Sequence, residues 1–129
     1  MSLTHFDSKG DAHMVDVSDK AVTSRVATAS GYIKMAPETF DIILEGRAKK
    51  GDVLGVARLA GIMGAKRTPD LIPLCHPLAL DKVQVDIHVN DRREVVIDCT
   101  ARVTAKTGVE MEALVATTAG LLTIWDMTK

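Results

Sequence analysis

The alternation of hydrophobic and polar positions predicts several strands. Residues 24–35 are small and weakly alternating, which favours a strand, and residues 14–17 have the pattern of a shorter one. The alternation is clearer in residues 82–89 and 94–105, which "NDRR" joins. These two segments predict a hairpin with one buried face and one wet or interfacial face. The faces expected to be buried carry Val83, Val85, Ile87 and Val89 in the first strand and Val95, Ile97, Cys99, Ala101 and Val103 in the second, whose opposite face begins with Glu94.

Three segments have the spacing of helices. Residues 37–46 begin with proline, which fits the first turn of a helix because no hydrogen bond is lost there. Asp52 is a good N-cap for a second helix over residues 53–66. A third helix is expected to start at a capping box in which Thr107 and Glu110 satisfy free amides. Apolar stripes are expected at Val53, Val56, Ala57, Ala60 and Met63 of the second helix and at Val109, Ala113, Ala116, Gly120, Ile124 and Met127 of the third.

This order of elements predicts the fold class. Gly55, Gly61 and Gly64 lie within the second helix, which favours close packing of that helix against a sheet or another helix. Strand, helix, helix, strand, strand, helix is the order of a ferredoxin-like α+β sandwich, with an antiparallel sheet and helices on one face. That fold closes with one more strand, for which the chain has no candidate. Residues 1–129 are interpreted as one domain, with a loose N-terminus over about residues 1–12.

Composition narrows the function classes. Net charge is -1, from 16 basic and 17 acidic residues, and this argues against bulk binding of nucleic acid. Aromatic residues make up only 3% of the chain, so a base-stacking platform is also disfavoured. The neutral total still permits a local cationic pocket. No stretch approaches the run of about 18 apolar residues that a spanning helix needs, and no signal peptide is recognised. We therefore expect no membrane partner and a cytoplasmic protein whose two cysteines are reduced.

The segment "RTPDLIPLCHPLAL" places Cys75 beside His76 among three prolines. Two adjacent ligands do not make a zinc site, so no metal is predicted. A Cys-His nucleophile pair is disfavoured because neighbouring side chains in an extended segment point apart. Cys75 is interpreted first as a small buried hydrophobic residue. For His76 two interpretations stay open, a hydrogen-bonded loop histidine and an imidazole that the stiff loop aims at a ligand.

Several cations lie next to helix ends. Lys66 and Arg67 end the second helix, where the helix dipole favours positive charge, so a structural role alone explains them. Lys50 and Lys106 each precede a glycine and a helix start. Such a pair offers amide donors and a point charge to a phosphate, although neither has the full glycine pattern of a phosphate loop.

A purely structural role accounts for some of the carboxylates better than for others. Glu110 is accounted for by the capping box, and the helix dipole also favours Glu112 in the first turn. Asp126 lies near a helix C-terminus, where the dipole disfavours an acid, and Lys129 shares its helix face. The plain interpretation is a surface ion pair worth about 0.5 kcal/mol. The functional interpretation, which the apolar flank "LLTIW" favours, is an acid–base pair in which burial favours the neutral amine of Lys129.

Four segments together resemble a known family. "MVDVSDK", "KGDVLGVARLAGIMGAKRTPDLIPLCHPL", "KTGVEMEAL" and "LTIWDMTK" are similar to cyclic pyranopterin monophosphate synthase of molybdenum cofactor biosynthesis, over nearly the whole chain from Leu3. The resemblance implies a ferredoxin-like subunit in a homohexamer, a trimer of dimers with active sites at subunit interfaces. It implies a lyase that converts 3',8-cyclo-7,8-dihydroguanosine 5'-triphosphate into cyclic pyranopterin monophosphate and diphosphate. No resident cofactor is implied with certainty, and Mg²⁺ is considered only as a companion of the triphosphate.

The resemblance also assigns roles to individual positions. It implies that Asp126, Lys129 and Lys50 are the catalytic residues, with Asp126 and Lys129 as general acid and base. Lys50, Lys66 and Arg67 would then offset the charge of the triphosphate and polarise its α-phosphorus, and His76 would orient or protonate the substrate. The substrate-binding positions that it implies are Leu74, Cys75, His76, Met111 and Glu112, with Glu110, Lys66 and Arg67 beside them.

Members of the family continue past the equivalent of Lys129 through a further strand and a Gly/Lys-rich tail, and we expect both to be absent here. Two other interpretations therefore stay open. One is a non-catalytic module that binds a nucleotide or pterin, and the other is a structural subunit of an oligomer.

Overall fold

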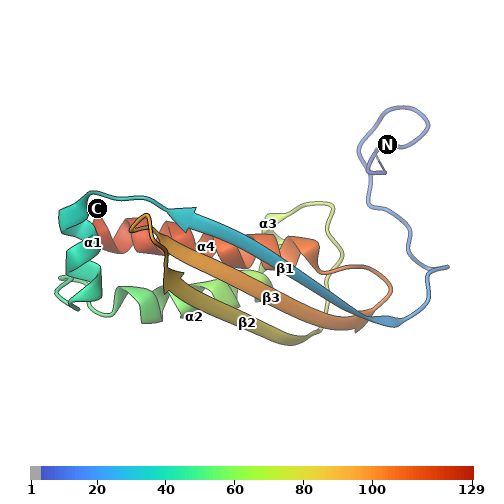
Figure 1. The fold of residues 1–129 in the computed structure, drawn as a ribbon. Helices are drawn as coiled ribbons and strands as arrows, with labels where there is room; N and C mark the ends of the chain where they lie inside the picture. Colours follow the sequence, from blue (N-terminus) through green and yellow to red (C-terminus); the bar gives the residue numbers. More distant parts are fainter. Residues whose placement is uncertain (1–3) are drawn as a thin grey trace.

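The computed structural model describes residues 4–129. Residues 1–3, part of the N-terminus expected to be loose, lie outside the described residues. Residues 4–12 form an exposed loop that an antiparallel bridge between Phe6 and Ala12 closes. This loop stands off from the rest of the molecule, as the blue trace in Figure 1 shows.

The predicted order of strands and helices is confirmed, with one short helix added. The additional helix, α3, follows α2 directly and has a proline in its first turn, as short helices often do. The strand expected at residues 14–17 is wrong, because this segment pairs with no strand of the sheet. The elements are β1 Thr23–Ile33, α1 Pro37–Leu44, α2 Val53–Lys66, α3 Thr68–Leu71, β2 Leu80–Val89, β3 Val95–Ala105 and α4 Glu110–Thr128.

The sheet is antiparallel and its strands lie in the order β1-β3-β2. Cys99 at the centre of β3 lies opposite Ala29 of β1 and Val85 of β2. The long helices α2 and α4 cover the same face of the sheet, as Figure 1 shows. The fold is therefore α+β, with helices on one face of an antiparallel sheet, and is compatible with the expected ferredoxin-like sandwich.

The hairpin buries the predicted face along most of its length. Every residue expected on the inner face of β3 is buried, whereas Val89 at the end of β2 is exposed. Glu94, expected on the wet face, is also buried. Asn90 explains this exception, since its Nδ2 donates to Glu94 Oε1 over 2.8 Å and its Oδ1 accepts from the Glu94 amide over 3.0 Å. A buried carboxylate needs such partners.

Helix α2 packs on α4 through glycine, which confirms the close-packing interpretation. A Cβ added to Gly64 would lie 2.9 Å from the Cβ of Ala119, so only a glycine allows this approach. The predicted stripe of α2 is wrong at Val56 and Met63, which are exposed. The glycine face turns towards α4, so these larger side chains point outwards. In α4 the predicted inward stripe is confirmed, with only Met127 partly exposed.

The two predicted N-caps have different outcomes. Asp52 caps α2 as expected, because its Oδ1 accepts from the Gly55 amide over 3.0 Å. The capping box at Thr107 is wrong. Helix α4 starts at Glu110 with Val109 as its N-cap and has no side-chain cap, so Thr107 lies too early and Glu110 is the first helical residue.

Candidate active site

The site residues predicted from the sequence lie at opposite ends of α4. Asp126 and Lys129 lie in its last turn, where Lys50 reaches them from the loop before α2, and we call this the aspartate end. Glu112 lies in the first turn, where Cys75 meets it, and we call this the cysteine–histidine end. With a rise of 1.5 Å per residue, the backbone positions of Glu112 and Asp126 are about 21 Å apart. A single chain therefore does not bring the two groups together.

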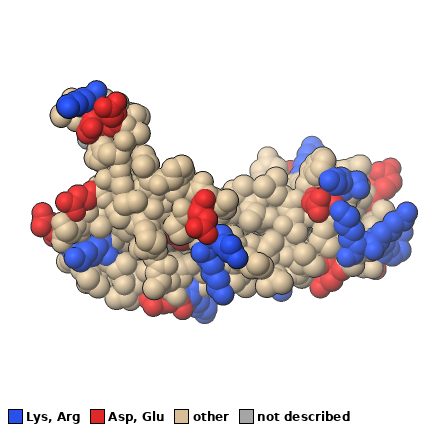
Figure 2. Space-filling model, turned by 180° about the vertical axis from the view of Figure 1, so that it is seen from behind, with Lys and Arg blue, Asp and Glu red and all other residues tan. Residues whose placement is uncertain are grey.

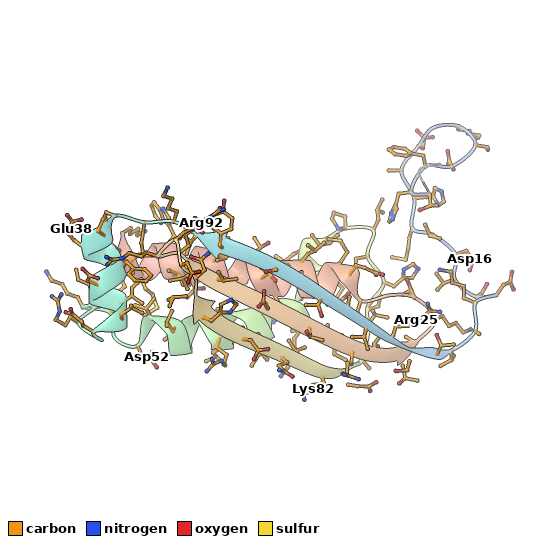
Figure 3. All side chains as sticks on the ribbon, viewed as in Figure 1. Asp16, Arg25, Glu38, Asp52, Lys82 and Arg92 are labelled. Carbon is orange, nitrogen blue, oxygen red and sulfur yellow. The ribbon has the colours of Figure 1, made fainter. Side chains whose placement is uncertain are left out.

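Figure 3 helps to locate the two ends. Glu38 of α1 and Asp52, the cap of α2, mark the side of the molecule that carries the aspartate end. Asp16 and Arg25 mark the opposite side, where the chain enters β1 and where the cysteine–histidine end lies. A bound molecule that contacted both groups of one chain would have to span the length of the helix layer.

At the aspartate end, one carboxylate lies between two lysines. Lys129 Nζ lies 3.2 Å from Asp126 Oδ1, and Lys50 Nζ lies 3.5 Å from Oδ2. Lys50 Nζ also donates to the backbone oxygen of Asp126 over 2.9 Å. The hydrogen bond from Lys129 and the charge of Lys50 hold the pKa of Asp126 below its usual value. The carboxylate is thus ionised at neutral pH and can accept a proton.

The buried environment expected for this pair is not what one chain provides. The side chains of Asp126 and Lys129 are 60% and 52% exposed. Lys129 does lie against an apolar surface, because its Nζ is 5.7 Å from the centre of the Trp125 ring. The predicted ion pair between Asp126 and Lys129 is therefore confirmed, whereas the predicted burial of Lys129 is wrong for the isolated chain.

A cavity of about 450 Å³ opens beside the aspartate end. Its wall includes Arg47 and Lys49 together with Lys129, so three cations surround one opening. Gly51 follows Lys50 with φ 105°, a left-handed conformation that suits glycine and lets the chain turn sharply into α2. Positive charge concentrated in this way fits an anion that carries several phosphates. Sequence analysis did not single out Arg47, although the basic run "RAKK" contains it.

A second cavity, of about 220 Å³, lies at the cysteine–histidine end. It brings together five of the predicted site residues and adds groups from the N-terminal segment that the sequence did not indicate, such as His5, Val15 and Lys20. The five predicted residues in its wall are Leu74, Cys75, His76, Glu110 and Met111.

Beneath this cavity, Glu112 is buried and faces a thiol. Cys75 Sγ lies 3.7 Å from Glu112 Oε2, and burial raises the pKa of the Glu112 carboxyl above its usual value. Burial and the neighbouring carboxyl raise the pKa of the Cys75 thiol to about 11. The thiol is therefore protonated at neutral pH and is not an activated nucleophile. The interpretation of Cys75 as a small buried group is correct in part, since it is half-buried.

His76 and Cys75 have different partners, since the thiol meets Glu112 whereas the imidazole meets Val15. The Nε2 of His76 lies 2.6 Å from the backbone oxygen of Val15, so the ring is held by the N-terminal segment and Nε2 carries a proton. This contact agrees with the interpretation of a hydrogen-bonded loop histidine. It also positions the ring at the wall of the cavity, so both interpretations of His76 remain compatible with the structure.

Lys66 and Arg67 line neither of these two cavities. They are exposed at the C-terminal end of α2, the end that packs beside the first half of α4 through Gly64. Among the described residues, no side-chain ion pair is formed by Lys66 or Arg67, so both charges are available to a bound anion.

Metal and membrane sites were also considered over residues 4–129. Within that range, no three or more His, Cys, Asp or Glu side chains are grouped closely enough to bind a metal ion. None of the described helices is both long enough and apolar enough to cross a membrane.

Comparison with known proteins agrees with the family resemblance. The MoaC family model matches residues 14–129. A relative from Dinoroseobacter shibae named "Cyclic pyranopterin monophosphate synthase" is 62% identical over 128 residues, which cover 98% of this chain and 81% of the relative. Relatives with the same name from Cereibacter sphaeroides and from Jannaschia sp. are each 60% identical, and the matches cover 98% of this chain and 80% and 78% of those relatives.

Proposed function

This chain belongs to the MoaC family, and from that premise we propose that it is a cyclic pyranopterin monophosphate synthase. The proposed reaction converts 3',8-cyclo-7,8-dihydroguanosine 5'-triphosphate into cyclic pyranopterin monophosphate and releases diphosphate, as a step of molybdenum cofactor biosynthesis. The enzyme is then a lyase that forms a cyclic phosphate. One structural observation carries the proposal beyond the comparison, namely an ionised Asp126 between two lysines beside a cationic cavity.

The charges at the aspartate end fit the chemistry of a triphosphate. Arg47, Lys49 and Lys129 line the cavity, and the amines of Lys50 and Lys129 lie 3.5 and 3.2 Å from the carboxylate of Asp126. Placed against the phosphate oxygens, these cations offset the negative charge that develops as diphosphate leaves. Lys66 and Arg67 add exposed charge from α2.

Proton transfers are assigned to the same cluster. In the cyclisation step, a ribose-derived hydroxyl oxygen forms a bond to the α-phosphorus, and the bond from that phosphorus to the bridging oxygen breaks. Asp126 accepts the hydroxyl proton, and diphosphate leaves with the electron pair of the broken bond. Lys129, 3.2 Å away, donates protons while the purine-derived ring is rebuilt. His76 orients or protonates the substrate from the cysteine–histidine end. The binding positions proposed there are Leu74, Cys75, His76, Glu110, Met111 and Glu112.

Assembly is part of the proposal. We propose a homohexamer, a trimer of dimers with active sites at subunit interfaces, in the cytoplasm. The separation of about 21 Å between Glu112 and Asp126 supports shared sites, since no single chain presents both groups to one small substrate. An interface would also exclude water from the exposed lysines and strengthen their effect.

The proposal is tested by incubating the purified chain with the cyclic dihydroguanosine triphosphate and assaying diphosphate together with cyclic pyranopterin monophosphate. We expect turnover with the wild-type chain and a loss of about 100-fold or more with Asp126→Asn, the range of a general base. The control Asp91→Asn, in the exposed turn before β3, should keep wild-type turnover.

Other outcomes would identify another function. Substrate binding without diphosphate release would replace the proposal with a non-catalytic binding module. Absence of any binding at low salt would indicate a structural subunit. Near-wild-type turnover of Asp126→Asn in a normally assembled protein would remove Asp126 from the catalytic step.

A further inference from the structure

The turn between β2 and β3 has an arginine at a position where glycine is usual. Arg93 has φ 59°, and among residues 4–129 it is the one residue other than glycine with a positive φ. Asn90 fixes the turn, since its Oδ1 accepts from the Arg92 amide over 3.0 Å and its backbone oxygen accepts from the Arg93 amide over 3.1 Å. Three-residue hairpin loops normally carry glycine at the left-handed position, because other residues are strained there. The side chain of Arg93 is therefore expected to contribute something that glycine cannot.

That side chain joins the turn to α1. The Nη2 of Arg93 donates to Asp41 Oδ1, and the guanidinium carbon lies 5.0 Å from the centre of the Phe40 ring. Phe40 is buried, whereas the side chains of Arg93 and Asp41 are 57% and 48% exposed. We call these three residues the α1 clamp. An ion pair this exposed adds little to the stability of the fold, so its main effect is to fix the position of α1 against the turn.

Helix α1 lies between the clamp and the cavity at the aspartate end. Figure 1 shows α1 at the end of the molecule, beside the end of α4. At 3.6 residues per turn, Thr39 and Ile42 lie on the face of α1 opposite to Phe40 and Asp41. Thr39 and Ile42 line the cavity of about 450 Å³. A shift of α1 at the clamp therefore moves one wall of this cavity.

The end of α1 also places the cations that follow it. The Gly46 amide donates to the backbone oxygen of Ile43 over 3.2 Å, and the Arg47 amide donates to that of Ile42 over 3.0 Å. Gly46 has φ 69°, the left-handed conformation with which many helices end. These bonds tie the loop to the last turn of α1, so the orientation of the helix determines where the basic side chains of residues 47–50 lie.

The charges around the cavity make its binding strength sensitive to this placement. Figure 2 shows basic side chains gathered at the end of the molecule where α1 and the end of α4 lie, with acidic side chains among them. Arg47 pairs with Glu45, and Lys50 pairs with Asp126. Because each cation already has an acidic partner, its net attraction for a polyanion depends on how closely the loop brings it to the phosphates.

We infer that Arg93 is a positioning residue, which holds α1 and the cationic loop after it where they bind the phosphates of the substrate. It acts through Asp41 and Phe40 and contacts no reacting atom. The inference rests on the proposed function for the identity of the substrate, although binding of a polyphosphate can be measured without it.

Calorimetric titration with inorganic tripolyphosphate tests the clamp without any turnover. Arg93→Gly should bind tripolyphosphate about fivefold more weakly than the wild type, the factor expected for loss of an exposed ion pair with its aromatic contact. Its thermal stability should not fall, because glycine adopts this φ without strain. Arg92→Ala is the matched control, since Arg92 is an exposed arginine of the same turn and holds the turn through its amide. It should bind as the wild type does.

The partner of Arg93 gives a prediction whose sign separates position from charge. Asp41→Asn removes a negative charge, so electrostatics alone would strengthen the binding of tripolyphosphate. Loss of the clamp should instead weaken binding, as Arg93→Gly does. The double variant should bind no more weakly than the weaker of the two single variants, because both changes break the same contact.

Two further measurements identify a positioning role. Amide hydrogen exchange at Gly46 and Arg47 should be faster in Arg93→Gly, whereas exchange in β3 should not change. With the proposed substrate, Arg93→Gly should raise KM about fivefold and leave kcat nearly unchanged, because bound phosphates hold the loop in place once substrate saturates the site. A fall in kcat at an unchanged KM would contradict the inference.

The outcomes separate this inference from the proposed function. Wild-type affinity of Arg93→Gly for tripolyphosphate, an equal loss with Arg92→Ala, or tighter binding by Asp41→Asn would each overturn the role of the clamp even if the enzyme turns over. The expected order of affinities without any turnover would support the clamp and count against the proposed reaction. Absence of tripolyphosphate binding by the wild-type chain would overturn the inference, since the cavity would then not be a phosphate site.

Discussion

Glu112 is a buried carboxyl whose surroundings raise its pKa. It is buried in the first turn of α4, and its side chain faces the protonated thiol of Cys75. The helix N-terminus favours the ionised form, whereas burial disfavours it, and burial prevails because the pKa is raised. The carboxyl can therefore hold a proton at a pH where surface glutamates have lost theirs.

This raised pKa predicts how stability depends on pH. The folded-state pKa of Glu112 lies above its unfolded value, so its contribution to the free energy of unfolding is full below about pH 4.5 and is lost as pH rises through the folded pKa. The Glu112→Gln variant does not lose stability in this way, because its amide does not ionise. Urea unfolding at a series of pH values measures the free energy of unfolding. As pH rises, this free energy should increase for the variant relative to the wild type, by at most about 1.4 kcal/mol per pH unit. Parallel curves for the two proteins would contradict the buried carboxyl.

The sequence predicted individual contacts only when they are local. Asp126 and Lys129 are three residues apart on one helix, so their ion pair follows from helical spacing alone. Lys50 meets the same carboxylate from 76 residues away, and no periodicity carries that information. The burial of Glu94 was missed for a related reason, since it depends on how Asn90 folds the turn back onto the strand.

At the scale of elements, the two predicted helix caps give a direct test. Asp52→Ala should lower the free energy of unfolding by about 1 kcal/mol, because it removes the acceptor for the Gly55 amide. Thr107→Ala should change it by less than about 0.5 kcal/mol, because Thr107 caps no amide of α4. Chemical unfolding followed by far-ultraviolet circular dichroism measures both. A larger loss for Thr107→Ala would mean that the capping box forms in solution.

The glycines at the contact between α2 and α4 predict that two alanine variants will differ in stability. Gly64→Ala should destabilise the fold by about 1–2 kcal/mol, because the new Cβ would lie 2.9 Å from the Cβ of Ala119, which cannot rotate away. Gly120→Ala should cost less, because its nearest neighbour is the flexible Cδ1 of Ile97 at 2.8 Å. Both glycines are helical, so the preference of alanine for helix, about 1 kcal/mol, adds equally to the two variants. Equal losses in urea unfolding would contradict the close approach of α2 and α4.

These elements were largely predictable, and the exceptions have physical causes. Helix α2 combines a good cap with helical periodicity, and its predicted bounds match the structure. The inward side of α2 was misjudged because glycines rather than large apolar residues make its contact, and a hydrophobic pattern does not register glycine. Residues 14–17 alternate like a strand, yet the carbonyl oxygen of Val15 accepts a hydrogen bond from His76 and not from a neighbouring strand.

At the scale of the whole molecule, the division of the site into two ends follows from the one helix that carries both groups. The predicted helix already separates Glu112 from Asp126 by about 21 Å, whereas only the fold reveals which other groups gather at each end. Each end of the helix has its own cavity, one cationic and one beside a buried carboxyl. The proposed reaction uses both sets of groups, so the proposal requires that more than one chain contribute to each site.

Subunit mixing tests this dependence. His76→Ala and Asp126→Asn should each be nearly inactive alone, because each damages every shared site. In mixed dimers, the intact His76 of one chain can meet the intact Asp126 of the other, so one of the two sites is restored. Random mixing should recover about a quarter of wild-type diphosphate release, since half of the dimers are mixed and half of their sites are intact. Co-expressed and separately purified variants are compared at equal total protein. Activity that stays at the average of the two variants after exchange would mean that each chain contains its own complete site.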